Sequence, residues 1–143
     1  MIVSVKAILK FKKKYLMQLR DKKKDIFFAN FWGFFGGQVD KKEDYKTAIK
    51  RELKEEINIK MKNFKKIFSF NYKISGIKSK FKTIYFTCEV KSLPKKVLIS
   101  EGQAAKFLTY NEIKKINVVP WDLTAISYLE ALKKKYIFPK NLK

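Results

Sequence analysis

A predicted amphipathic helix over residues 43–57 is the strongest constraint on the fold of this chain. Its apolar side chains recur every four residues, which is the spacing of a helix face that packs against a core. These side chains are Tyr45, Ile49, Leu53 and Ile57. Asn58 follows them, and Asn is common in the left-handed backbone conformation that ends helices. The sequence therefore predicts a helix that packs along one face and is capped at Asn58.

Three glutamates lie beside the apolar face of the same helix. A helix turns about 100° per residue, which places Glu52, Glu55 and Glu56 within roughly a third of its circumference. Like charges at these spacings repel by about 0.2–0.5 kcal/mol per pair. The chain has only 13 acidic residues against 34 basic ones, so the clustering of these three glutamates, here called the acidic ridge, requires an explanation. A bound divalent cation would supply one; the alternative is a solvated acidic face paired with lysines.

The remaining segments predict a mixed sheet with helices packed on it. Strands are expected at residues 2–11, 15–20, 32–37, 63–75 and 80–91, with short strands at 97–100 and 105–109. Residues 21–31 are expected to form a loop, and Gly36 and Gly37 a tight turn that aims backbone groups at the acidic ridge. A short helix is expected near 111–116, and a last helix from Pro120 to about Lys135, because proline is favoured in the first turn. We expect one domain, residues 1–143.

The composition limits the possible functions. The chain has no histidine, which excludes histidine triads and histidine metal sites, and Cys88 is its only cysteine. The formal net charge of +21 is compatible with nucleic-acid binding. However, surfaces that bind phosphate usually contain arginine, and only Arg20 and Arg51 are arginines here. A lysine-rich chain also fits an AT-rich genome, so nucleic acid is a possible partner that we do not favour. We see neither a membrane span nor a secretory signal, and expect a cytoplasmic protein.

One segment resembles the metal-binding signature of the Nudix hydrolases. The family pattern is Gly, five residues, Glu, seven residues, then Arg-Glu-aliphatic-any-Glu-Glu-any-Gly-aliphatic. Eight positions match it at the right spacing: Gly37, Glu43, Arg51, Glu52, Leu53, Glu55, Glu56 and Ile59. Asn58 stands where the family has Gly, and Phe35 where its lead-in has Pro. The resemblance implies an α+β fold of the α/β/α sandwich type, with a mixed sheet packed between helices.

The resemblance also implies a metal site. Glu52 and Glu56 would be the main ligands of Mg²⁺, with Mn²⁺ as an alternative, and the carbonyl of Gly36 would complete the coordination. Glu55 would bind a further metal or orient water. The segment EGQ at 101–103 is similar to one in bacterial oxidised-dGTP pyrophosphohydrolases, in which the Glu helps to bind metal or to activate water. Either Glu101 or Glu55 is therefore expected to accept a proton from water.

Further residues are assigned supporting roles by the same resemblance. Arg51 is expected to form a salt bridge, with Glu43 as the candidate partner, that holds the acidic ridge in place. Arg20 stands where many family members carry a phosphate-facing arginine, and Gly37 is expected to contact substrate. Asp122 falls near the base-reading position of the oxidised-dGTP enzymes, although it also suits a plain helix start.

The implied activity is hydrolysis of a nucleoside diphosphate linked to another moiety. The first expectation is a house-cleaning nucleoside triphosphate pyrophosphatase. The alternatives are a nucleotide-sugar or ADP-ribose pyrophosphatase, an RNA 5′-pyrophosphohydrolase, and a catalytically silent nucleotide- or RNA-binding module. Either a monomer or a homodimer is compatible with the sequence. Glu56→Gln is expected to reduce turnover at least about a hundredfold, with a modest loss of stability.

Overall fold

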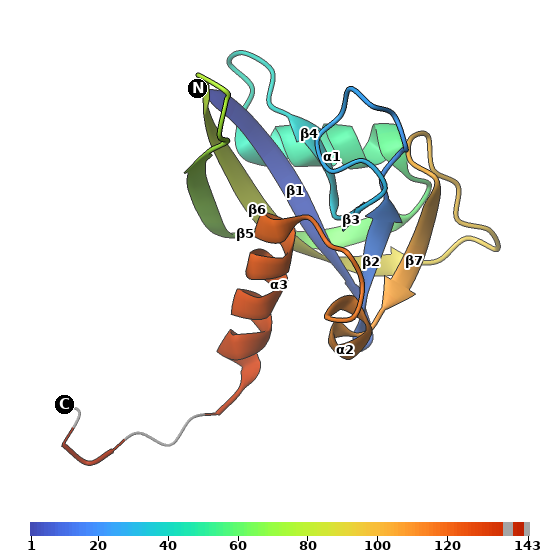
Figure 1. Cartoon of the computed structure of the whole chain (residues 1–143). Helices are drawn as coiled ribbons and strands as arrows, with labels where there is room; N and C mark the ends of the chain where they lie inside the picture. Colours follow the sequence, from blue (N-terminus) through green and yellow to red (C-terminus); the bar gives the residue numbers. More distant parts are fainter. Residues whose placement is uncertain (136–138, 142–143) are drawn as a thin grey trace.

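The computed structural model describes residues 1–135 and 139–141. Within them a seven-stranded mixed sheet packs against helices (Figure 1). In chain order the elements are β1 (Ile2–Phe11), β2 (Lys14–Leu19), β3 (Trp32–Gly33), β4 (Phe35–Gln38), α1 (Tyr45–Glu56), β5 (Lys60–Lys73), β6 (Lys80–Ser92), β7 (Ala104–Leu108), α2 (Tyr110–Ile113) and α3 (Pro120–Lys133). The main strand order is β3-β2-β1-β6-β5, with β4 also pairing with β1 and β7 with β2. Strands β1 and β6 run parallel and the other pairs antiparallel.

The two faces of the sheet bury separate hydrophobic cores. Along β1, Val5 and Leu9 belong to one core together with Leu53 of α1. Ile8, which points to the opposite face of the strand, belongs to the other core together with Ile126 of α3. Figure 1 shows α1 and α3 on opposite sides of the sheet. The predicted α/β/α sandwich is therefore confirmed.

The turn expected at Gly36 and Gly37 is wrong, because both glycines lie inside strand β4. Their pairing partners in β1 are Lys6 and Val5, and neither glycine has a positive φ. A Cβ at Gly36 would collide with the backbone carbonyl of Val5. Glycine is thus required here for close packing rather than for an unusual backbone conformation.

The expected helix cap at Asn58 is also wrong. Helix α1 ends at Glu56, and Ile57 already has extended backbone with φ −147°. The Asn58 side chain instead accepts a hydrogen bond from Leu98 N at 2.7 Å and donates one to the Lys96 carbonyl at 3.0 Å. The short strand expected at residues 97–100 is absent, because Ile99 makes only an isolated bridge to Ile57.

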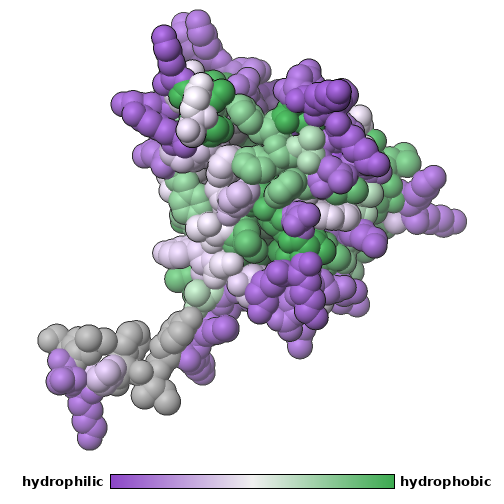
Figure 2. Space-filling view, in the orientation of Figure 1, coloured by the Kyte–Doolittle hydropathy of each residue, from purple (hydrophilic) through white to green (hydrophobic). Residues whose placement is uncertain are grey.

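Hydrophilic side chains gather at the periphery of the molecule and surround a more hydrophobic area on the face shown in Figure 2. Several large apolar side chains are exposed, including Phe27 and Tyr128. In the described part of the chain, no helix has both the length and the apolar character needed to cross a membrane.

Candidate functional site

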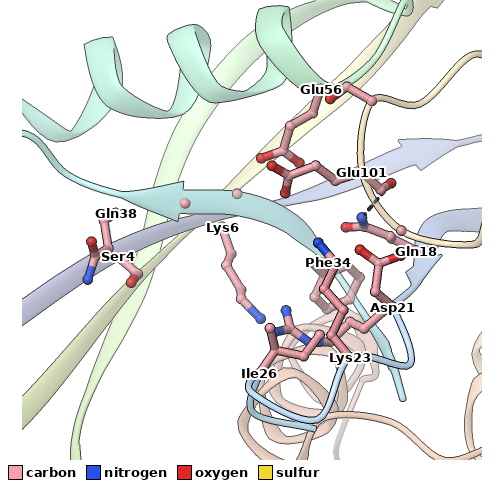
Figure 3. A pocket seen from close by; sticks show the side chains of 15 residues that line it. Ser4, Lys6, Gln18, Asp21, Lys23, Ile26, Phe34, Gln38, Glu56 and Glu101 are labelled. Carbon is pink, nitrogen blue, oxygen red and sulfur yellow. Dashed lines mark hydrogen bonds between the residues drawn. The ribbon is translucent and has the colours of Figure 1, made fainter. Parts of the chain in front are cut away.

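A cleft of about 670 Å³ opens where β4, the end of α1 and the segment after residue 99 meet. Its wall combines acidic, basic and glycine positions. Among the residues that line it are Gly36, Gly37, Glu56, Glu101, Arg20 and Lys6. Figure 3 shows the carboxylates of Glu56 and Glu101 close together, with the Lys6 side chain extending from β1 in another part of the cleft. The structure thus unites side chains that are up to about a hundred positions apart in the sequence.

Gly37 gives the acidic ridge room to approach the sheet. A Cβ at this position would lie 2.5–2.6 Å from the two carboxylate oxygens of Glu52. A Cβ atom essentially never approaches a non-bonded atom so closely, so any side chain at position 37 must displace Glu52. The spacing between Gly37 and Glu52 in the sequence therefore reflects a direct contact between β4 and α1.

Glu56 carries the most perturbed carboxyl group of the cleft. It is only 8% exposed, and its pKa is raised to about 8, with burial as the largest cause. A hydrogen bond with Glu52 and the negative charges of Glu52 and Glu101 also contribute to this rise, while a backbone hydrogen bond from Gly36 lowers the pKa. Without a cation, these carboxylates cannot all ionise near neutral pH at low cost.

Arg51 binds the opposite side of the ridge. It donates two hydrogen bonds to Glu43, from Nε at 2.8 Å and from Nη2 at 2.9 Å, and one from Nη1 to Glu52 at 2.9 Å. The hydrogen bond from Arg51 lowers the pKa of Glu43. The predicted salt bridge is confirmed. The two hydrogen bonds to Glu43 hold the guanidinium in place, and its single hydrogen bond to Glu52 orients that carboxylate.

The position of Glu101 depends on the end of α1. Ser100 N donates to the Glu56 carbonyl at 2.9 Å, so the segment that carries Glu101 is attached to the last turn of the helix. On the other side, Gln18 Nε2 donates to the Glu101 carbonyl at 2.9 Å. Gly102 follows with φ +85°, a left-handed conformation that favours glycine. These contacts bring Glu101 to Glu56.

The donor set suits a hard divalent cation. Glu52, Glu56 and Glu101 offer oxygen ligands, and their mutual repulsion would be relieved by positive charge. Within residues 1–135 and 139–141, no three acidic, cysteine or histidine side chains already surround one point as a metal ligand set would. The chemistry therefore fits a cation, which would have to draw the carboxylates together.

Comparison with known proteins supports the same interpretation. The NUDIX domain family model matches residues 2–129. The chain belongs to the Nudix family. It is thereby identified as a pyrophosphohydrolase enzyme, from a family that uses divalent metals.

Individual relatives cover most of this Nudix chain. An 8-oxo-dGTP diphosphatase from Buchnera aphidicola subsp. Schizaphis graminum is 27% identical over 115 residues, which are 80% of this chain and 82% of the relative. A NUDIX hydrolase from Nitrosomonas europaea superimposes with a TM-score of 0.75 at 18% identity, covering 99% of this chain and 95% of the other. A bifunctional NMN adenylyltransferase/ADP ribose pyrophosphatase from Francisella tularensis, complexed with AMP and a Mn ion, gives 0.70 at 20% identity, covering 92% of this chain and 41% of the other.

Several predicted site residues of the Nudix chain do not line the cleft: Glu43, Arg51, Glu52, Glu55 and Asp122. Glu52 lies next to Glu56, which does line it. The Glu55 side chain is 60% exposed and lies 3.6 Å from Arg51 Nη1, on the outer side of the ridge. Asp122 is fully buried. Arg20 does line the cleft, with Nε donating to the Phe27 carbonyl at 3.0 Å. Its guanidinium is thus anchored to the 21–31 loop.

A second cavity of about 340 Å³ adjoins the cleft and shares Lys6 and Arg20 with it. Aromatic rings dominate its wall. Tyr72 stacks on Trp121 with ring centroids 4.5 Å apart, and on Phe81 at 5.5 Å. We call this cavity the aromatic compartment. Its flat, apolar surfaces suit a planar ring.

Sequence reasoning missed Lys6 and the aromatic compartment. Lys6 is the one charged residue in the apolar run from Ile2 to Leu9, and a charge inside a buried strand was an available signal. No comparable signal existed for Tyr72 and Trp121. They come from β5 and α3, which only the folded chain brings together.

Proposed function

We propose that this Nudix enzyme hydrolyses nucleoside triphosphates in a house-cleaning role, giving a nucleoside monophosphate and pyrophosphate. The observation that carries the proposal is the junction of an acidic cleft and an aromatic compartment. Phosphates and their cation suit the first, and a nucleobase suits the second. The activity named for the Buchnera relative is of the same class.

Mg²⁺ is the proposed cofactor, with Mn²⁺ as a substitute. Glu52, Glu56 and Glu101 would hold it. When bound, the cation neutralises phosphate oxygens and makes water more acidic. Lowering the net negative charge among these carboxylates would also counteract the part of the raised Glu56 pKa that comes from the charges of Glu52 and Glu101, although burial is its largest cause.

The other groups divide the remaining tasks. We assign the acceptance of the proton from water to Glu101 rather than to Glu55, because Glu101 lines the cleft whereas Glu55 points outward. Arg20 would bind phosphate from the loop side. Arg51 would keep Glu52 oriented and would not contact substrate. This division leaves the chemistry to carboxylates, in agreement with a chain that contains no histidine.

ADP-ribose hydrolysis is the second candidate. The Francisella neighbour carries that activity in its name, and the two adjoining cavities give room for a diphosphate with a group on each side. RNA 5′-pyrophosphate removal ranks third. A silent binding module ranks last, because the box carboxylates are all present. A cytoplasmic location and a monomeric or homodimeric state remain part of the proposal.

A hydrolysis panel tests this assignment. The purified chain is incubated with normal and oxidised nucleoside triphosphates, ADP-ribose, nucleotide sugars and 5′-triphosphate RNA, each with Mg²⁺ and with excess EDTA. We expect pyrophosphate release from triphosphates, only with the metal. Glu56→Gln should reduce turnover at least about a hundredfold. Glu55→Gln is the matched variant one position away, and its effect should be smaller. Metal-independent turnover, or no turnover of any substrate, would refute the proposal.

A further inference from the structure

The side chain of Gln103 connects two parts of the cleft that are far apart in the sequence. Its Nε2 group donates one hydrogen bond to the Arg20 carbonyl at 2.8 Å and another to Asn30 Oδ1 at 3.0 Å. Arg20 directly precedes the 21–31 loop and Asn30 lies near its end, whereas Gln103 lies two positions after Glu101. The amide therefore ties the segment that carries Glu101 to both ends of this loop.

These two contacts depend on the donors of the amide group. A backbone carbonyl can only accept a hydrogen bond, so the group that faces the Arg20 carbonyl must be a donor. Gln103 has two N–H donors on Nε2, and each has an acceptor here. Glutamate would place an acceptor against the carbonyl, and methionine, which has nearly the same length, would offer no donor.

The backbone of Gln103 is held independently of its side chain. Gln103 N donates to the Leu19 carbonyl at 2.8 Å, and β7 begins at the next residue, where Ala104 pairs with Leu19. The side chain itself is exposed and belongs to neither hydrophobic core. Its two hydrogen bonds are therefore not needed to form the sheet, and they call for another explanation.

The loop that Gln103 holds is part of the substrate site. Arg20 lines both the cleft and the aromatic compartment, and its Nε donates to the Phe27 carbonyl in the loop at 3.0 Å. Phe28 of the same loop lines the aromatic compartment. A displaced loop would therefore move Arg20 relative to Glu101, on which the proposed chemistry depends.

Two other hydrogen bonds hold the Glu101 segment, but neither reaches the loop. Ser100 N donates to the Glu56 carbonyl at 2.9 Å, and Gln18 Nε2 donates to the Glu101 carbonyl at 2.9 Å (Figure 3). The first attaches the segment to α1 and the second attaches it to β2. Among the hydrogen bonds of the described residues, those of the Gln103 side chain join the segment to the loop.

We propose that Gln103 is a positioning residue that holds Glu101 and Arg20 at a fixed separation. The inference rests on the proposed function, in which Glu101 accepts a proton from water and Arg20 binds phosphate. Both groups act on one substrate from different segments of the chain, so their relative placement controls the rate. Gln103 acts through these two residues and does not react itself. Its loss lowers kcat through Glu101 and raises KM through Arg20.

The test measures kcat and KM for 8-oxo-dGTP and dGTP with Mg²⁺, in the native chain and in Gln103→Met. We expect kcat to fall about tenfold, less than the loss of a catalytic carboxylate costs, and KM to rise about threefold. Asn111→Leu is the matched control, because it removes an exposed amide on α2 that lines neither the cleft nor the aromatic compartment. Both constants should stay unchanged in it.

A second variant removes one of the two acceptors. Asn30 has a φ of +64°, a left-handed conformation that glycine adopts readily, so Asn30→Gly deletes the side chain and preserves the backbone. It should reproduce part of the effect of Gln103→Met. Because both variants remove the same contact, the effect of the double variant should be smaller than the product of the two single effects.

The Glu101→Gln background separates positioning from a general loss of structure. If Gln103 acts through Glu101, Gln103→Met should leave kcat nearly unchanged in that background, because the proton acceptor is already lost. The same tenfold fall in both backgrounds, or unchanged constants in Gln103→Met, would overturn the inference and leave the hydrolase assignment standing. If the native chain hydrolyses no nucleotide with Mg²⁺, the proposed function itself fails and the inference fails with it.

Discussion

The buried carboxyl of Glu56 makes a prediction about stability without metal. Its pKa lies near 8 in the folded chain against an ordinary value of 4.5, so the folded chain holds this proton more tightly than the unfolded chain does. The contribution of Glu56 to stability is therefore fully present below about pH 4.5 and is lost as the pH rises toward 8. One pKa unit corresponds to about 1.4 kcal/mol, so the loss should be about 3 kcal/mol by pH 7.

Glu56→Gln should remove this loss. Glutamine has almost the same shape, cannot ionise, and can still accept the backbone hydrogen bond from Gly36. In EDTA the variant should therefore be more stable than the native chain at pH 7, by about 3 kcal/mol, and nearly equal to it at pH 5. This reverses the modest loss of stability that the sequence alone led us to expect, because the sequence did not reveal the burial of Glu56.

The measurement is urea unfolding in EDTA at several values between pH 5 and pH 8. The difference between the native chain and the variant is the relevant quantity, because other titrating groups cancel in it. Glu55→Gln is the control: its side chain is exposed, and its curve should follow the native one. Addition of Mn²⁺ at pH 7.5 should stabilise the native chain much more than the Glu56→Gln variant. A stability difference that is independent of pH would refute the electrostatic reasoning.

Three further substitutions test the supports of the site. Gly37→Ala should lower kcat about tenfold or more while the chain stays folded, because the new methyl displaces the Glu52 carboxylate; steady-state kinetics and circular dichroism check this. Arg51→Lys keeps the charge but loses the paired contacts with Glu43, so we expect a similar fall in kcat that added metal does not restore. Asn58→Ala removes two hydrogen bonds to the 96–98 segment and should cost about 1 kcal/mol in urea unfolding, and normal stability would contradict the structural role.

Features set by local periodicity were predictable from the sequence. The apolar spacing of α1 predicted its position to within two residues at each end, and Pro120 does begin α3. The acidic ridge followed from the same geometry, because helix pitch alone places Glu52 beside Glu56. The long strands were predictable for a similar reason, since their aromatic and β-branched residues form extended runs.

Features that depend on distant contacts were not predictable. Gly36 and Gly37 suggested a turn, yet they are glycines because the β1 backbone and the Glu52 carboxylate press against β4. Asn58 suggested a helix cap, yet its side chain binds a segment about forty positions away. In both cases the residue type fitted two physical roles, and only a partner remote in the sequence decided between them.

The charge pattern around the site explains why a lysine-rich chain needs a cation in the cleft. Arg51 neutralises the outer part of the acidic ridge through Glu43 and Glu52. In the described portion of the chain, no salt bridge reaches Glu56 or Glu101, although the sequence offers 34 basic residues. Their negative charge is therefore left for a ligand to neutralise. The same fold places Lys6 in the cleft that Glu56 and Glu101 also line, at the junction with the aromatic compartment.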